Sequence, residues 1–323
     1  MIKIALVGLG QLGAHHARIL ATSRLIASEK ALLSAVVDSN RARALEIGGK
    51  YNIPYFTEIP PEILSDITAA VIVTPTPSHY ALAKKFLESG IHCFVEKPFT
   101  STLEEADELI KIARDGNLIL QVGHIERFNP AVRAAMPYVK KPLFIEACRI
   151  GNFSPRVAHI GVVMDLMIHD IDIVLMYLAR YGKVESVEAY GAKVLTEHED
   201  MAKVRLKFSN GCVCDLSASR LSPQSVERRL RIFQKDSYIS VDYAKRDVKI
   251  YMKPVGPTGN FMDIKMIKPD VEQRDQLESE LLHFIECVSK KKEPEVSGEH
   301  GRNALELASE ICRNMIFLSD INR

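Results

Sequence analysis

The first third of the chain repeats one hydrophobic pattern, a short apolar run followed by a longer stretch whose apolar residues share one helical face. Short apolar runs of this kind are typical of buried parallel strands, and the amphipathic stretches of helices that cover them. The expected strands are residues 2–7, 33–37, 69–73, 91–95 and 118–122. A helical stretch that ends at residue 20 follows the first strand, and further helices are expected over 41–47, 80–88 and 103–114. Strands that alternate with helices predict an α/β fold with a doubly wound parallel sheet. We therefore expect an N-terminal Rossmann domain over residues 1–122.

The pattern changes after residue 122. Polar and apolar residues alternate over 203–208 and again over 248–252, which predicts strands with one buried and one open face. Residues 162–178 are almost continuously apolar and predict a buried helix, and two amphipathic helices are expected over 271–289 and 302–318. Residues 123–323 are thus expected to form an α+β domain with an open, mainly antiparallel sheet.

A glycine motif follows the first predicted strand directly, with the sequence Gly8-Leu9-Gly10-Gln11-Leu12-Gly13. In a G-x-G-x-x-G turn the first glycine makes the tight turn, the second lets the backbone approach a pyrophosphate and the third allows close packing of helix on strand. The phosphates would lie at the helix N-terminus, where free N–H groups favour negative charge. We expect cofactor contacts from the three glycines and from Gln11 and Leu12.

Asp38 ends the second predicted strand, 25 residues after Gly13. This is close to the spacing at which an acidic residue binds the ribose 2′-hydroxyl of NAD, and a carboxylate there would repel the 2′-phosphate of NADP. NAD is therefore favoured, while Arg41 leaves NADP as an alternative. Asp38 could instead serve as the N-cap of the helix that begins at Arg41.

Further polar residues follow the next two strands of the predicted sheet. Thr74, Pro75 and His79 lie after the third strand, and Glu96 and Lys97 after the fourth. Ligands of doubly wound folds bind at the carboxyl ends of the strands. We therefore include these five residues in the predicted cofactor site.

The buried helix over 162–178 carries a polar stripe. At about 100° per residue, Asp165, His169 and Asp172 share one face. Buried charge is costly unless it is partnered, so the stripe is either an internal network, in which the aspartates hold a core histidine, or the wall of a site.

Composition excludes several other classes of protein. The 323 residues carry a net charge of +1, which gives no reason to expect nucleic acid or a membrane surface as a partner. The six cysteines are scattered and form no pair of C-x-x-C motifs, so we expect neither bound metal nor disulfides. The N-terminus lacks the build of a signal peptide, and we expect a cytoplasmic protein.

The glycine motif, Glu96-Lys97-Pro98 and Asp165-x-x-x-His169-Asp170 together resemble the glucose-fructose oxidoreductase, inositol dehydrogenase and MocA-type family over essentially the whole chain. The resemblance implies an NAD- or NADP-binding Rossmann domain and a second domain that covers the substrate and often forms the subunit interface. A homodimer or homotetramer through the C-terminal sheet is therefore expected. The family's catalytic lysine, aspartate and histidine correspond to Lys97, Asp165 and His169.

These residue types suit the oxidation of a secondary alcohol. An imidazole, with a reference pKa of about 6.5, can accept the hydroxyl proton, which is the role expected for His169. Lys97 would stabilise the developing alkoxide, and Asp165 would orient the imidazole. Asp172 could act on the imidazole from the other side, as part of the substrate site.

The stretches GHIERFNP and PR-x(4)-GVV-x-DL-x-IHDID are most similar to family members that oxidise the 3-hydroxyl of UDP-N-acetylglucosamine. A nucleotide sugar needs cations for its diphosphate, and Arg127, Arg156 and Arg220 are the candidates. Two alternatives remain: a dehydrogenase of a free sugar, inositol or other polyol, and a non-catalytic nucleotide-binding regulator. Many relatives have glycines before the aspartate where this chain has Val162-Val163-Met164, which weakens the analogy with polyol dehydrogenases.

Overall fold

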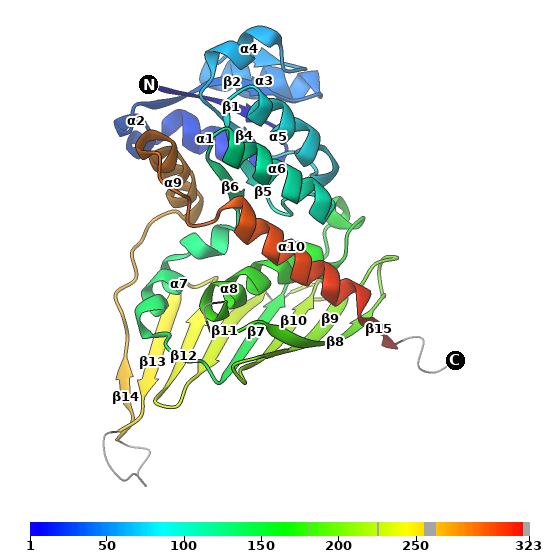
Figure 1. Ribbon diagram of the computed structural model, residues 1–323, viewed down its shortest axis with the longest axis vertical. Coiled ribbons are helices and arrows are strands. Elements are labelled where there is room, and N and C mark those ends of the chain that lie inside the picture. The colour runs from blue at the N-terminus through cyan, green and yellow to red at the C-terminus, as the bar shows by residue number, and fades with distance from the viewer. Residues whose placement is uncertain (180, 225, 255–262, 319–323) are drawn as a thin grey trace. The chain divides into compact units, whose positions relative to one another are not determined.

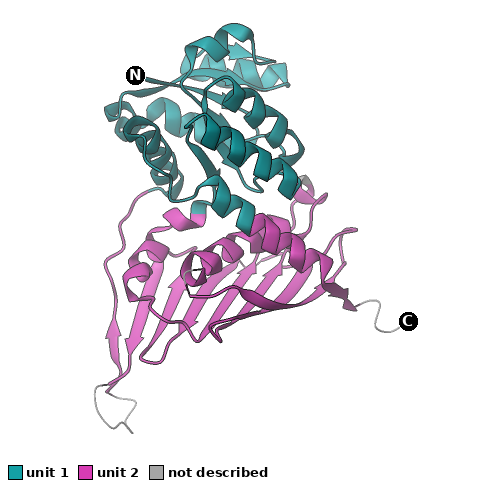
Figure 2. Cartoon of the chain, viewed as in Figure 1, with its two compact units in different colours: residues 1–125, 275–303 teal, residues 126–274, 304–323 magenta. Residues whose placement is uncertain are grey.

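The computed structural model describes residues 1–179, 181–224, 226–254 and 263–318, except for the side chain of Arg156. The chain divides into two compact units, of which unit 1 comprises residues 1–125 and 275–303 and unit 2 residues 126–274 and 304–323 (Figure 2). The first division lies close to the expected boundary at residue 122. The return of 275–303 to unit 1 differs from the expected organisation, because its helix supplies Leu281, Phe284 and Ile285 to the core of unit 1.

Unit 1 contains a six-stranded, fully parallel sheet with the order β3-β2-β1-β4-β5-β6 (Figure 1). Its strands are β1 (Ile2–Val7), β2 (Ala31–Val37), β3 (Tyr55–Phe56), β4 (Ala69–Ile72), β5 (His92–Glu96) and β6 (Leu120–Gly123). This is the strand order of dinucleotide-binding Rossmann folds. The predicted doubly wound parallel sheet is therefore confirmed.

Helices flank this sheet, and polar caps set where several of them begin. The helices are α1 (Gln11–Thr22), α2 (Arg24–Ser28), α3 (Arg41–Tyr51), α4 (Pro61–Asp66), α5 (His79–Glu88), α6 (Leu103–Asp115) and α9 (Gln276–Lys290). Thr102 and Glu105 form a reciprocal capping box at α6, which satisfies backbone N–H groups in the first turn. Asp275 caps α9, so that helix begins five residues later than the apolar pattern alone predicts.

Unit 2 is built on a nine-stranded sheet with the order β14-β13-β12-β11-β7-β10-β9-β8-β15. Its strands are β7 (Phe144–Ile150), β8 (Val184–Ala192), β9 (Met201–Phe208), β10 (Val213–Ser219), β11 (Glu227–Phe233), β12 (Ser237–Asp242), β13 (Asp247–Met252), β14 (Lys265–Ile267) and β15 (Met315–Phe317). The pairings are antiparallel except for β7 with β10 and β8 with β15. A mainly antiparallel sheet is therefore confirmed.

One face of this sheet is covered by helices and the other is open (Figure 1). The covering elements are α7 (Pro130–Ala135), the π-helix η5 (Val163–Met167), α8 (Ile168–Leu178) and the C-terminal part of α10 (Gly298–Arg313). Along β9 burial alternates, with Val204, Leu206 and Phe208 buried against the helices and the intervening basic residues exposed. The alternation is the one predicted from the sequence.

The end of the chain differs from the expected helix over 302–318. Helix α10 begins at Gly298 and ends at Arg313, and Met315–Phe317 form strand β15. β15 pairs in parallel with β8 at the edge of the sheet. β15 thereby covers Ala189, Tyr190 and Gly191 of this edge, where the apolar spacing alone suggested a further helical turn.

Candidate active site

The glycine loop has the geometry that a pyrophosphate site requires. Gly8 has a φ of +92°, and a Cβ atom built there would lie 2.6 Å from the carbonyl oxygen of Val73. A Cβ atom on Gly13 would collide with the carbonyl oxygen of Gly8, whereas one on Gly10 would meet no protein atom within 4 Å. Gly8 and Gly13 are thus required by the protein's own packing, while the space beside Gly10 is open for a ligand.

This loop leads directly into helix α1, whose N-cap is Gly10. Gly10 has no side chain to cap that end of the helix, and a helix N-terminus favours an anion. Gln11 and Leu12 are the first two residues of α1 and both are exposed. The residues present therefore fit the pyrophosphate of a dinucleotide.

Asp38 lies beside the same loop. One carboxylate oxygen accepts a hydrogen bond from the backbone N–H of Leu9 at 2.7 Å, and the other accepts one from Asn40 at 2.8 Å. The N-cap of α3 is Asn40, whose side chain accepts hydrogen bonds from Ala42 and Arg43. The alternative of Asp38 as helix cap is therefore wrong, and its position next to the glycine loop supports a role at the ribose.

His79 connects the segments that follow β4 and β5. Its Nδ1 lies 2.9 Å from the carbonyl oxygen of Pro98, and its Nε2 lies 2.7 Å from the carbonyl oxygen of Thr74. Pro75 is the N-cap of the short 3-10 helix η1 (Thr76–Ser78) that precedes this histidine. The ring of His79 is buried, so in this structure it holds the two strand ends together and would act on a cofactor through the backbone that it positions.

Lys97 follows β5 and is partly exposed, at the start of a cis peptide bond to Pro98. The preceding Glu96 is buried, and its carboxylate accepts a hydrogen bond from the backbone N–H of Lys97 at 3.2 Å. The other oxygen of Glu96 lies 3.0 Å from Nε2 of His16, a fully buried residue of helix α1. Glu96 thus supports the backbone at Lys97, and the sequence analysis missed His16, which gave no signal beyond a histidine in an amphipathic helix.

In unit 2, Asp165 and His169 come from the start of the apolar helix. The structure places Asp165 in the π-helix η5 and His169 in the first turn of α8, so the expected single α-helix over 162–178 is wrong for its first turn. Both residues are partly exposed. Single π-turns occur frequently at functional sites, which agrees with the proposed roles of these residues.

The next two aspartates of the helix are fully buried and paired with arginines. The carboxylate of Asp172 accepts two hydrogen bonds from Arg127, at 2.7 and 2.6 Å. Asp170 accepts two from Arg149, at 2.8 and 3.0 Å, and Arg149 also donates to Glu126 at 2.9 Å. The polar stripe therefore divides into a partly exposed part, Asp165 and His169, and the buried Asp172, which binds Arg127 of the 3-10 helix η2 (Ile125–Phe128). Asp170, beside the stripe, joins α8 to strand β7 through Arg149.

Two of the three arginines predicted for a substrate diphosphate are internal. Arg127 is 5% exposed and binds Asp172, so both lose support as substrate ligands. Arg220 is 1% exposed and binds Asp200, Thr196 and two backbone carbonyls, which corrects its expected role. Arg156 lies in the 3-10 helix η4 (Pro155–Val157), but its side chain lies outside the described residues.

Arg228 is a further candidate that the sequence analysis missed. It is an exposed residue of β11, paired in register with Arg149 and on the same face as buried Leu230 and Ile232. Burial and the guanidinium of Arg149 lower the pKa of Arg228, and nearby carboxylates, Asp165 among them, act in the opposite direction. Side chains two residues apart on a strand lie on the same face of the sheet. Because Leu230 is apolar and expected to be buried, this spacing could have placed Arg228 on the face covered by helices.

The described residues were also compared with what a metal site and a membrane-spanning helix require. Within the described part of the chain, no group of three or more histidine, cysteine, aspartate or glutamate side chains could hold a metal ion. None of the described helices combines the length and apolar character that crossing a bilayer requires.

The strand order and the glycine loop of unit 1 define a dinucleotide-binding protein of the Rossmann type. Residues 2–124 match the oxidoreductase family with an NAD-binding Rossmann fold, and residues 155–315 match the C-terminal alpha/beta domain of the same family, Gfo/Idh/MocA. The chain belongs to this family and is an NAD(P)-dependent dehydrogenase that acts on CH–OH groups. The expected family resemblance is confirmed.

Individual relatives extend the match over nearly the whole chain. UDP-N-acetylglucosamine 3-dehydrogenase of Acidithiobacillus ferrooxidans is 33% identical over 315 residues, which cover 96% of each chain. A solved structure of the same enzyme covers 97% of each chain with a TM-score of 0.89. The NAD-dependent scyllo-inositol 2-dehydrogenase of Bacillus subtilis is 30% identical over 92% of this chain and 89% of its own.

Proposed function

We propose that this enzyme oxidises the 3-hydroxyl of UDP-N-acetylglucosamine or of a related nucleotide sugar, with NAD as the hydride acceptor. The observation that carries the proposal is the 33% identity with a UDP-N-acetylglucosamine 3-dehydrogenase along 96% of both chains. Asp38 beside the glycine loop favours NAD over NADP, because its carboxylate would repel a 2′-phosphate.

Three side chains would carry the chemistry. His169 would accept the proton of the reacting hydroxyl, since imidazole titrates near neutral pH. The ammonium of Lys97 would stabilise the alkoxide as charge develops on the oxygen, and Asp165 would orient the imidazole and stabilise its protonated form. When bound, NAD supplies the acceptor for the hydride from the carbinol carbon.

The diphosphate of the substrate would be bound by Arg156 and Arg228. Arginine suits this role because its planar fork can donate two hydrogen bonds to one phosphate. Arg228 is exposed and lies on the same face of the sheet as α8. Arg127 and Arg220 are excluded from the proposal because internal carboxylates already bind them.

A dehydrogenase of free inositol or another polyol is the second candidate, favoured by the 30% identity with the scyllo-inositol enzyme. The purified protein with NAD would be given UDP-N-acetylglucosamine and myo-inositol in parallel while NADH formation is followed by its absorbance. We expect NADH only with the nucleotide sugar. NADH formation with myo-inositol alone would refute the proposed substrate, and no turnover with any sugar would refute both.

We also propose that the open face of the unit 2 sheet joins copies of this chain. Four aromatic residues form a continuous row across β7, β11, β12 and β13: Phe144, Phe233, Tyr238 and Tyr251. Neighbouring ring centroids lie 6.0, 4.9 and 5.6 Å apart. An exposed apolar patch of this kind marks an interaction surface. Light scattering should give a dimer or tetramer that Tyr238→Asp dissociates, and a monomeric wild-type protein would refute the assignment.

A further inference from the structure

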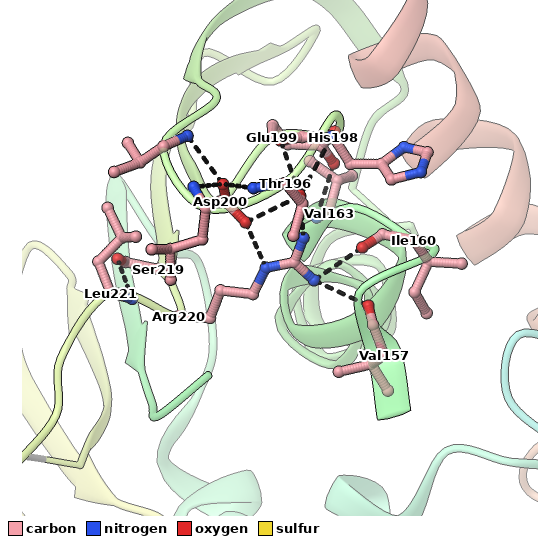
Figure 3. Close-up of polar contacts among 12 residues, drawn as sticks. Val157, Ile160, Val163, Thr196, His198, Glu199, Asp200, Ser219, Arg220 and Leu221 are labelled. Carbon is pink, nitrogen blue, oxygen red and sulfur yellow. Dashed lines mark hydrogen bonds and ion pairs between the residues drawn. The ribbon is translucent and has the colours of Figure 1, made fainter. Parts of the chain in front are cut away.

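The chain enters the helix with Asp165 and His169 through residues 157–163, and this entry segment is held mainly by its backbone (Figure 3). The carbonyl oxygens of Val157 and Ile160 both accept hydrogen bonds from one nitrogen of Arg220, at 2.9 and 2.8 Å. The next two backbone N–H groups of the entry segment are bound by Glu199. Its carbonyl oxygen accepts the N–H of Val162 at 3.0 Å, and its carboxylate accepts that of Val163 at 3.2 Å.

Arg220 is itself held by a second carboxylate. Its Nε donates to Asp200 at 2.7 Å, and another guanidinium nitrogen donates to the hydroxyl of Thr196 at 2.8 Å. Arg220 is 1% exposed and Asp200 is fully buried, so the pair is shielded from water. The guanidinium is therefore fixed in one orientation when it binds the two carbonyl oxygens of the entry segment.

Asp200 is anchored by the backbone of the loop that precedes it. One carboxylate oxygen accepts the N–H groups of Val194, Leu195 and Thr196, at 2.8, 2.6 and 2.9 Å. Burial alone would raise the pKa of Asp200, but these three hydrogen bonds and Arg220 hold that pKa well below its usual range. The carboxylate consequently remains ionised and keeps Arg220 paired throughout the neutral range.

The side chain of Glu199 packs directly against the backbone of the entry segment. A Cβ atom built on Gly161 would fall on the Glu199 carboxylate, so that carboxylate is in direct contact with the backbone at Gly161. The carbonyl oxygen of Gly161 in turn accepts the N–H of Asp165 at 3.0 Å. One chain of hydrogen bonds and close contacts thus leads from Glu199 through Gly161 to the backbone of Asp165.

We infer that Arg220, Asp200 and Glu199 are positioning residues, which fix the entry segment and thereby set the place of Asp165 in the π-turn. Arg220 binds the main chain of this segment at two carbonyl oxygens and Glu199 binds it at two N–H groups, so together they hold four backbone groups between Val157 and Val163. The effect of these residues on turnover rests on the proposed function, because it requires Asp165 and His169 to act on the substrate. Their effect on the order of the entry segment does not depend on that function.

The test uses two matched pairs of variants. Glu199→Gln keeps a carbonyl oxygen as acceptor for Val163, whereas Glu199→Ala removes it. Arg220→Met removes all the hydrogen bonds of that side chain. The control Arg274→Met removes a partly exposed arginine that pairs with Glu272 in the same unit. Hydrogen exchange of the peptide 157–165, kcat, KM and the pH profile of kcat/KM are measured for each full-length variant.

We expect faster exchange of this peptide in Glu199→Ala and Arg220→Met, with kcat lower by about 10- to 100-fold, as for a displacement of about 1 Å at a reacting group. KM for NAD should not change. The acidic limb of the pH profile should move to lower pH, because a displaced Asp165 stabilises the imidazolium less. Glu199→Gln and Arg274→Met should behave like the wild-type protein.

The inference would be overturned if the peptide 157–165 of Glu199→Ala exchanged at the wild-type rate and its pH profile did not move. It would also be overturned if Glu199→Gln lost as much activity as Glu199→Ala. If Arg220→Met does not fold, the Glu199 pair decides alone. If the wild-type protein oxidises no sugar, the proposed function fails, and the exchange measurement still decides whether these residues hold the entry segment.

Discussion

The buried pair of Arg127 and Asp172 gives a sharp test of how the helix with His169 is fixed. The side chain of Arg127 is 6% exposed and that of Asp172 is 1% exposed. Arg127→Met would remove the guanidinium and leave the Asp172 carboxylate buried. Two hydrogen bonds to a charged group, at 2.7 and 2.6 Å, would be lost. The remaining carboxylate could neither reach water nor keep its ion-pair partner.

The expected cost follows from two independent estimates. A hydrogen bond to a charged group contributes about 1.5–3 kcal/mol, so two contribute about 3–6 kcal/mol. Removing one partner of a buried ion pair costs about 3–5 kcal/mol, mostly because an uncompensated charge remains. We therefore expect Arg127→Met to lower the free energy of unfolding of unit 2 by about 3–5 kcal/mol. Arg127→Met combined with Asp172→Leu should recover most of this loss, because no charge is then left buried.

The assay is urea unfolding followed by far-ultraviolet circular dichroism, since the chain contains no tryptophan for fluorescence. The slope with urea concentration must stay constant for the midpoints to be compared as stabilities. Arg274→Met, at an exposed pair, is the control and should change the free energy of unfolding by at most about 1 kcal/mol.

Two results would refute this reasoning. A loss below about 1 kcal/mol in Arg127→Met would place the pair in the energetic class of surface ion pairs. A double variant as unstable as the single one would show that the Asp172 carboxylate, buried without Arg127, is not the source of the cost. If Arg127 instead binds a substrate phosphate, as its sequence context suggested, the single variant would lose affinity for UDP while keeping its stability.

Three further predictions concern the cofactor and pH. Gly10→Ala should leave the unfolding midpoint unchanged, because the added Cβ meets no protein atom within 4 Å. The same variant should bind NAD about tenfold or more weakly in calorimetry. Unchanged affinity would contradict the pyrophosphate assignment. Burial lowers the pKa of His92, whose Nδ1 accepts the N–H of Ile119. The neutral imidazole therefore contributes to the free energy of unfolding, and this contribution is full above about pH 6.5 and is lost as the pH falls. His92→Asn keeps an acceptor and should flatten the dependence of the urea midpoint on pH, and an equally steep dependence would argue against this origin. The pKa of Asp200 is held low, so the stability gap between wild type and Asp200→Asn should be full above about pH 4 and shrink as pH falls further; a gap that widened in acid would contradict it.

The sequence predicted the arrangement of unit 1 because each of its signals is local. Apolar runs specify buried strands, and the chain returns to the same edge of a parallel sheet after every strand. Gly8, Thr74 and Lys97 follow β1, β4 and β5, which are neighbours in the observed sheet. Their common edge is therefore confirmed, while their contacts with NAD remain a proposal.

The fate of the arginines could not be predicted in the same way. Arg127 binds Asp172, 45 residues further along the chain, and Arg220 binds Asp200 on an adjacent part of the sheet. No periodicity shows which carboxylate will face a given guanidinium after folding. The π-turn at Asp165 is equally invisible, because an extra residue in one helical turn leaves the apolar composition of that stretch unchanged.

The return of residues 275–303 to unit 1 has a consequence for how this protein is made. A ribosome delivers the whole nucleotide-binding sheet early, yet Leu281, Phe284 and Ile285 of the missing apolar core emerge only after most of unit 2 has been translated. A nascent chain that ends before them exposes the apolar surface that α9 covers and is therefore prone to aggregate. A truncation at residue 122, which looks like a clean domain by its strand pattern, should accordingly be insoluble. An expression fragment of this half needs α9 joined back to it.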